Sequence, residues 1–183
     1  TINRQFRGTG APSWKFISKE VVENAARDLE MHPSDLHFML STGARGLLSD
    51  VLASFTYSYV SSHRMKKTIR KVITELATIG HMVIVGRGGA GVLHGYPSTL
   101  HVRLQAPMDW RIREICRIRG LTRDEAVKLA EETDEKRRAL IELVSGVTYS
   151  PYLFDLIMNC NTLSMADMAD TVISLMKSRK LLP

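Results

Sequence analysis

Residues 81–93 read HMVIVGRGGAGVL, an apolar run followed by four glycines within six residues. The run at 82–85 is short and rich in β-branched residues, which is typical of a buried strand. Glycines directly after a strand predict a tight turn, and the amides of such a turn can hold a phosphate. Arg87 stands among these glycines, at the carboxyl end of the predicted strand. Because open α/β sheets bind ligands at this end, Arg87 is a candidate for binding phosphate oxygens.

Further strands are predicted on both sides of this segment. Residues 100–104 and 154–158 are short apolar runs that we interpret as buried strands, and residues 1–6 could form another. Helical patterns lie between these runs, and strands that alternate with helices are typical of βαβ units. The sequence therefore predicts an α/β fold with a parallel sheet.

Three helices have clear sequence signals. The first carries apolar residues at helical spacing over residues 69–76, and Gly80 is expected to end it. Thr122 and Ser164 are each followed three residues later by a carboxylate, which is the pattern of a capping box. The helix after Thr122 is expected to extend to about Val144, with charged residues over most of its surface.

The composition limits the classes of partner. A chain of 183 residues with 44% hydrophobic content can form one domain with a sizeable core. Its net charge of +6 favours anionic partners. However, residues 111–138 hold seven carboxylates among seven arginines and two lysines, and aromatic residues make up only 7% of the chain, so we do not expect nucleic-acid binding.

Other features argue against a membrane protein and against a metalloprotein. No apolar stretch approaches the 18 or so residues of a membrane-spanning helix, and residues 1–10 do not resemble a signal peptide, so we expect a cytoplasmic protein. The two cysteines and six histidines show no metal-ligand spacing. We therefore expect no metal site built from protein ligands.

One alternative is a dinucleotide-binding oxidoreductase. The segment from Gly86 to Gly91 satisfies G-x-G-x-x-G after a predicted strand, and Asp109 lies near the distance of a ribose-binding acid. That fold needs a crossover helix before the next strand. Only residues 92–99 are available for it, and Pro97 interrupts them. We therefore regard this alternative as the weaker one.

Several segments, taken in order, resemble the cytidylate kinases, and especially the cytidylate kinase-like branch of the nucleoside monophosphate kinases. The resemblance extends from about residue 81 to residue 176, and the order of the segments makes it more specific than any one motif. The segments are Gly86-Arg87, Val92-Leu93, Pro97, the strand HVRLQAP at 101–107, the arginine-bearing helix from Met108, the lid-like pattern Glu131-x-x-Asp134-x-x-Arg137-Arg138 and the strand FDLIMN at 154–159.

The resemblance implies a single domain over residues 1–183 with a P-loop kinase fold, a central parallel sheet and a helical lid over about 108–144. It implies an enzyme that uses ATP and Mg²⁺ to phosphorylate a small acceptor, most simply a nucleoside monophosphate. Each site residue follows from a matching position. The acceptor would be bound by Gly86, Arg87 and Gly88, the donor phosphates by Arg4, Gly8, Thr9, Gly10, Arg113 and Arg117, and the catalytic residues would be Asp134, Arg137 and Arg138.

Asp134 also has an interpretation that needs no ligand, since it can pair on the helix surface with Arg137 at i+3 or with Arg138 at i+4. Residues 36–59 contain further apolar groups that could pack on a second copy in a homodimer.

The amino terminus fits the family only in part. The sequence contains no Gly-Lys-Ser or Gly-Lys-Thr, so another cation would have to replace the lysine of the phosphate loop. Only three residues separate Gly10 from Trp14, too few for the helix that follows such a loop. Either the protein has lost this helix or residues are missing here from the sequence; we favour the second, because a sheet without the helix would expose apolar surface. The first would suit a non-catalytic nucleotide-binding or interaction protein on the same fold.

Overall fold

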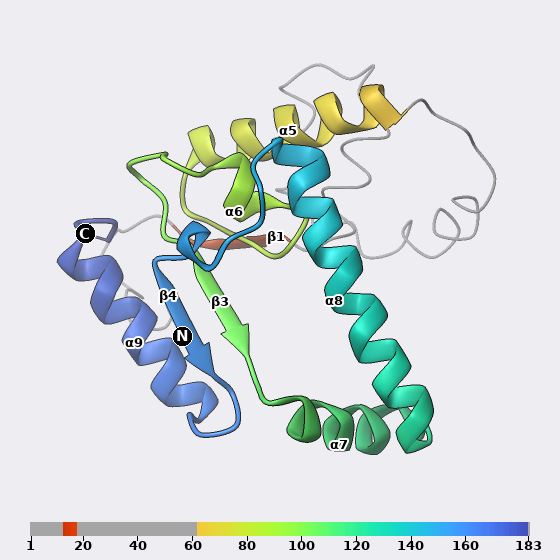
Figure 1. The fold of residues 1–183 in the computed structure, drawn as a ribbon. Helices are drawn as coiled ribbons and strands as arrows, with labels where there is room; N and C mark the ends of the chain where they lie inside the picture. Colours follow the sequence, from red (N-terminus) through yellow and green to blue (C-terminus); the bar gives the residue numbers. More distant parts are fainter. Residues whose placement is uncertain (1–12, 18–61, 183) are drawn as a thin grey trace.

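The computed structural model describes residues 13–17 and 62–182, and these form a mixed α/β structure (Figure 1). The elements follow in the order β1 Lys15–Ile17, α5 Ser62–Ile79, β2 Met82–Ile84, α6 Gly89–Val92, β3 Val102–Gln105, α7 Met108–Arg119, α8 Arg123–Ser145, the 3₁₀ turn η2 Pro151–Leu153, β4 Leu156–Asn159 and α9 Met165–Ser178. The three strands predicted from residue 82 onward are confirmed within two residues. The expected strand at 1–6 and the apolar groups at 36–59 lie outside the described residues.

The described strands form two parallel pairs. β1 pairs with β2, and Ile17 lies opposite Ile84. β3 pairs with β4, and Arg103 lies opposite Ile157. Parallel pairing was predicted and is confirmed. Within the described segments the two pairs are separate sheets, so a single central sheet stays a prediction.

The strands are less buried than we predicted. In β1 and β2 the side chains of Ile17 and Ile84 belong to the core, whereas Phe16 and Val83, which lie opposite each other, are 66% and 41% exposed. Successive residues of a strand point to opposite faces, so one face of this pair is covered and the other is open.

The helix signals are confirmed. Gly80 adopts a positive φ of 75°, and its amide donates to the Leu76 carbonyl at the end of α5. Capping boxes begin α8 at Thr122 and α9 at Ser164. Gly146, also at positive φ, caps α8, which ends at Ser145, one residue beyond the expected Val144. No helix in the described part of the chain is long and apolar enough to cross a membrane.

The main core lies where α5, the β1–β2 pair, the glycine segment and the end of α8 meet. Val72, Ile73 and Leu76 of α5 are fully buried there. Leu93, just after α6, and Val144 of α8 complete this cluster. Figure 1 shows the consequence for α8, which begins beside α7 and ends against α5 and α6. One long helix therefore connects the α7 region to the glycine segment.

Candidate functional site

The chain reverses sharply after β2, in the segment that was predicted to be a tight turn. Gly86, Arg87 and Gly88 all have positive φ, at 78°, 56° and 75°. Glycine adopts this left-handed conformation freely, whereas an arginine does so rarely, and such strain is most often found at functional sites. The Gly89 amide donates to the Gly86 carbonyl at 3.0 Å and closes the turn. Arg87 thus lies at the carboxyl end of β2, as the sequence predicted.

Burial affects the charge of Arg87. Its side chain is half-buried, and the loss of water lowers the pKa of its guanidinium. An arginine stays protonated even so. A partly desolvated cation gains more than an exposed one from an anionic partner, so this position suits the binding of an anion.

Gly88 of the turn and Gly91 of α6 both pack against α8. A Cβ on Gly88 would lie 3.4 Å from both the Leu140 carbonyl oxygen and the Val144 Cβ. A Cβ on Gly91 would lie 2.6 Å from the Ser145 Oγ and 2.8 Å from its Cβ, which is closer than side chains pack. Gly88, predicted to bind the acceptor, is therefore a buried packing residue whose backbone lies beside α8. This packing joins residues that are distant in the sequence, so it could not be predicted from the sequence alone.

The helix after the turn is short. α6 contains four residues, and the chain then passes through residues 93–101 to β3. A dinucleotide-binding unit would place a full crossover helix here. The structure therefore gives no support to the oxidoreductase alternative.

Helices α7 and α8 are consecutive and contact each other over the region predicted to be a lid. α7 ends at Gly120, and only Leu121 and Thr122 precede α8. Ile112 of α7 and Ala126 and Ala130 of α8 are buried, and the Ala130 carbonyl accepts from Arg111 of α7. Whether the pair closes over a ligand stays a prediction.

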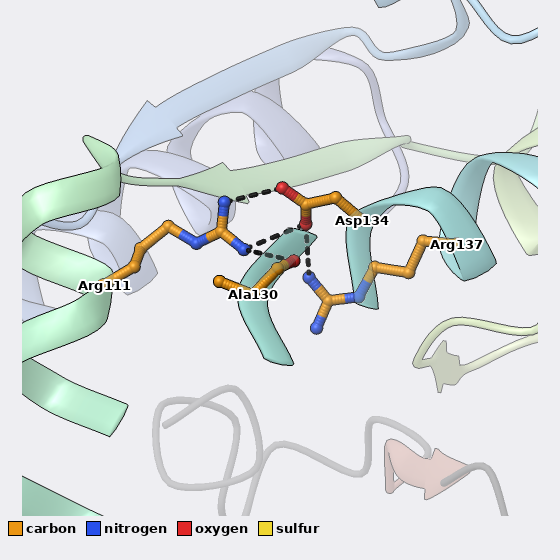
Figure 2. A network of polar contacts seen from close by, with 4 residues as sticks. All are labelled: Arg111, Ala130, Asp134 and Arg137. Atoms are coloured by element: carbon orange, nitrogen blue, oxygen red, sulfur yellow. Dashed lines mark hydrogen bonds and ion pairs between the residues drawn. The ribbon is translucent and has the colours of Figure 1, made fainter. Parts of the chain in front are cut away.

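Asp134 joins α8 to α7 through Arg111, and it also lies near Arg137 of its own helix (Figure 2). Arg111 of α7 donates from Nη1 to Oδ2 at 2.6 Å and from Nη2 to Oδ1 at 2.9 Å. Arg137 of α8 places its Nη1 3.7 Å from Oδ1. The pairing of Asp134 with Arg137 was one of two predicted alternatives, but the stronger partner is Arg111. Sequence spacing could not identify Arg111, because it is 23 residues away on another helix.

Arg137 lies on the side of α8 that faces the glycine turn. It precedes Leu140 by three residues and Val144 by seven, so the three share one helix face, and both Leu140 and Val144 contact Gly88. Three residues of helix correspond to about 4.5 Å. The backbone of the glycine turn thus packs on α8 at residues 140–144, one to two helical turns beyond Arg137.

Arg138 has different surroundings. Together with Met108 and Lys128 it lines a hollow of about 480 Å³ along α8. The remaining lining residues are Glu131, Glu132, Asp134 and Glu135. Four carboxylates against two cations make this hollow unfavourable for a bare phosphate.

The predicted donor-site residues are more dispersed. Arg113 and Arg117 both point to solvent from α7, and Arg117 pairs with Glu114 at 2.7 Å. α7 lies beside the first half of α8, away from the glycine turn (Figure 1). Arg4, Gly8, Thr9 and Gly10 lie outside the described residues. Within the described segments, no group of three or more His, Cys, Asp or Glu residues is placed to hold a metal ion.

Comparisons with known proteins agree with this geometry. The structure resembles the crystal structure of an uncharacterized protein from Eubacterium ventriosum ATCC 27560, with a TM-score of 0.60 and 15% sequence identity. That likeness covers 96% of this chain and 89% of the other, and at this identity it shows the fold alone. No curated protein matches the chain. The model of the cytidylate kinase-like family matches residues 13–162, more than four fifths of the sequence. This chain belongs to the cytidylate kinase-like family.

Proposed function

We propose that the protein is an ATP-dependent phosphotransferase that phosphorylates a nucleoside monophosphate. Membership of the cytidylate kinase-like family suggests nucleotide kinase activity. The observation that carries the finer proposal is the position of Arg87, half-buried in a left-handed turn at the end of β2, with the next residue packed on the arginine-bearing face of α8.

In this proposal Arg87 binds the phosphate of the acceptor. Its planar guanidinium can donate two hydrogen bonds to one phosphate group. The rigid turn holds the side chain in place before the acceptor arrives, which reduces the entropy lost on binding. An oxygen of the acceptor phosphate then attacks the γ-phosphorus of ATP, the bond to the β-γ bridging oxygen breaks, and ADP leaves.

Arg137 would stabilise the phosphoryl group in transfer. Catalysis of this reaction depends mainly on positioning and on the neutralisation of charge on the phosphoryl oxygens. Arg137 is 72% exposed, and it shares a helix face with the residues that contact the glycine turn. Asp134 would act through its arginine partners, and Arg138 would contribute less because carboxylates surround it.

The described residues are compatible with ATP that binds together with Mg²⁺. Mg²⁺ in nucleotide sites is held by phosphates, water and one or two carboxylates, so it does not require a cluster of protein ligands. When bound, it would neutralise charge on the donor phosphates. Gly8, Thr9 and Gly10, with Arg4, are proposed to hold those phosphates, and Arg113 and Arg117 to approach them from α7.

A non-catalytic nucleotide-binding protein is the second candidate. It is favoured by the lack of a phosphate-loop lysine and by the three residues between Gly10 and Trp14. Such a protein would keep Arg87 and its turn, and would bind nucleotides without turning them over.

The test is the release of ADP from Mg·ATP with CMP, dCMP, UMP, AMP or GMP as acceptor. The variant Arg87→Asn removes the guanidinium, and asparagine tolerates the left-handed conformation. Arg123→Ala is the control, because it removes an exposed arginine of α8 that pairs with the exposed Asp109. We expect turnover that depends on one acceptor, is lost in Arg87→Asn and is kept in Arg123→Ala. Nucleotide binding without turnover would support the second candidate, and equal activity of Arg87→Asn and wild type would contradict the role of Arg87.

A further inference from the structure

Asp134 faces two guanidinium groups but is bonded mainly to one of them. The Arg111 fork matches both carboxylate oxygens, whereas the 3.7 Å approach of Arg137 is too long for a hydrogen bond. The side chains of Arg111 and Asp134 are 23% and 27% exposed, which protects their pairing from water. One carboxylate cannot neutralise two cations, so the uncompensated charge belongs to the exposed Arg137.

We propose that Arg111 is a positioning residue for Arg137. By occupying both oxygens of Asp134, it leaves the Arg137 guanidinium available for phosphate oxygens. The inference rests on the proposed function. Arg111 of α7 would affect the reaction only through Asp134 and Arg137 of α8.

Sequence spacing explains what Arg111 prevents. Asp134 precedes Arg137 by three residues on the same helix, a separation at which opposite charges pair. Without Arg111, the Asp134 carboxylate would have Arg137 as its nearest cation and would hold it along the helix surface. An arginine held there would have to break that pair before it could bind a phosphate.

The packing between the helices lets Arg111 reach Asp134. Ala130 is 1% exposed, and its carbonyl oxygen accepts from Arg111 Nη2 at 3.5 Å. Its small side chain leaves space for the guanidinium against α8 (Figure 2). The position of Arg111 is thus determined by the helix pair and not by Arg137.

Two variants distinguish the positioning of Arg137 from a purely structural role of Arg111 in joining α7 to α8. Arg111→Ala leaves Asp134 free to hold Arg137, whereas Arg111→Ala with Asp134→Asn removes the competing charge as well. We expect Arg111→Ala to lower kcat about tenfold to a hundredfold, since a weakened contact costs less than a deleted one. The double variant should recover most of this loss. In an Arg137→Ala background, Arg111→Ala should have no further effect.

A binding measurement gives a readout that does not require turnover. Inorganic tripolyphosphate, titrated by calorimetry, should bind more weakly to Arg111→Ala than to wild type, and Asp134→Asn should restore the affinity. Arg123→Ala is the matched control, because Arg123 also joins α8 to α7 through Asp109 but has no contact with Asp134. It should change neither kcat nor the affinity. If Arg111→Ala fails to fold, Arg111→Lys, which keeps the charge but not the fork, should show a smaller loss of the same kind.

Several outcomes would overturn the inference. If Asp134→Asn does not rescue Arg111→Ala, then Arg111 serves only to join the helices. Unchanged tripolyphosphate affinity in Arg111→Ala, or no binding by wild type, would also refute it. Wild-type protein that binds tripolyphosphate but phosphorylates no acceptor would refute the proposed function alone, and the binding comparison would still decide the role of Arg111.

Discussion

Replacing Gly91 by alanine tests the packing of the glycine turn on α8. The new Cβ would lie 2.6 Å from Ser145 Oγ, 2.8 Å from Ser145 Cβ and 3.0 Å from Ile141 Cγ2. Overpacking of this kind costs about 1–3 kcal/mol, and three short contacts, all with side-chain atoms of α8 that can shift slightly, place the cost near the middle of that range, at about 2 kcal/mol. The higher helix propensity of alanine returns up to about 1 kcal/mol. We therefore expect Gly91→Ala to lower the free energy of unfolding by about 1–2 kcal/mol.

Gly89 provides a matched control in the same short helix. A Cβ on Gly89 would meet only Ile84 Cγ2, at an ordinary 3.6 Å, so Gly89→Ala should be neutral or stabilising. Urea denaturation followed by circular dichroism measures both variants against wild type. If Gly91→Ala proves as stable as Gly89→Ala, the glycine segment does not pack on α8 as described.

Three further predictions concern single side chains. Arg137→Ala should lower kcat at least about tenfold more than Arg138→Ala, because carboxylates surround Arg138; equal losses in the ADP-release assay would contradict this. Burial lowers the pKa of His101, so the unfolded chain takes up its proton at a higher pH than the folded protein. The free energy of unfolding should therefore decrease as the pH falls below about 6.5, and urea titrations at several pH values should show a weaker decrease for His101→Gln. Ser164→Ala should cost about 1 kcal/mol, because Ser164 Oγ accepts from the Asp167 amide at 3.1 Å; an unchanged thermal midpoint would argue against the cap.

The local structure could be predicted well because it depends on nearby residues. Capping boxes at Thr122 and Ser164 span three residues each, and the left-handed Gly80 follows the last turn of its helix. The strand at 156–159 begins two residues later than expected, because Pro151 starts a 3₁₀ turn in which the Phe154 amide donates to the Pro151 carbonyl.

The candidate site was predicted less completely because it depends on contacts between distant segments. The position of Arg87 after a strand is a local property and was predicted. Gly91 packs against Ser145, which is 54 positions away, and Arg111 pairs with Asp134, which is 23 positions away. Sequence periodicity does not reveal contacts of this kind. The donor-site residues from Arg4 to Gly10 were predicted only through the family resemblance and stay predictions.

In the proposed reaction, Arg87 and Arg137 act on one pair of bound nucleotides. A dinucleoside pentaphosphate, which joins a donor and an acceptor nucleoside through five phosphates, occupies both halves of such a site at once. Its binding can be measured by calorimetry with wild type, Arg87→Asn, Arg137→Ala and the control Arg123→Ala. We expect a 1:1 complex that is weakened by Arg87→Asn and by Arg137→Ala and unaffected by Arg123→Ala. Binding that is indifferent to both Arg87 and Arg137 would contradict it.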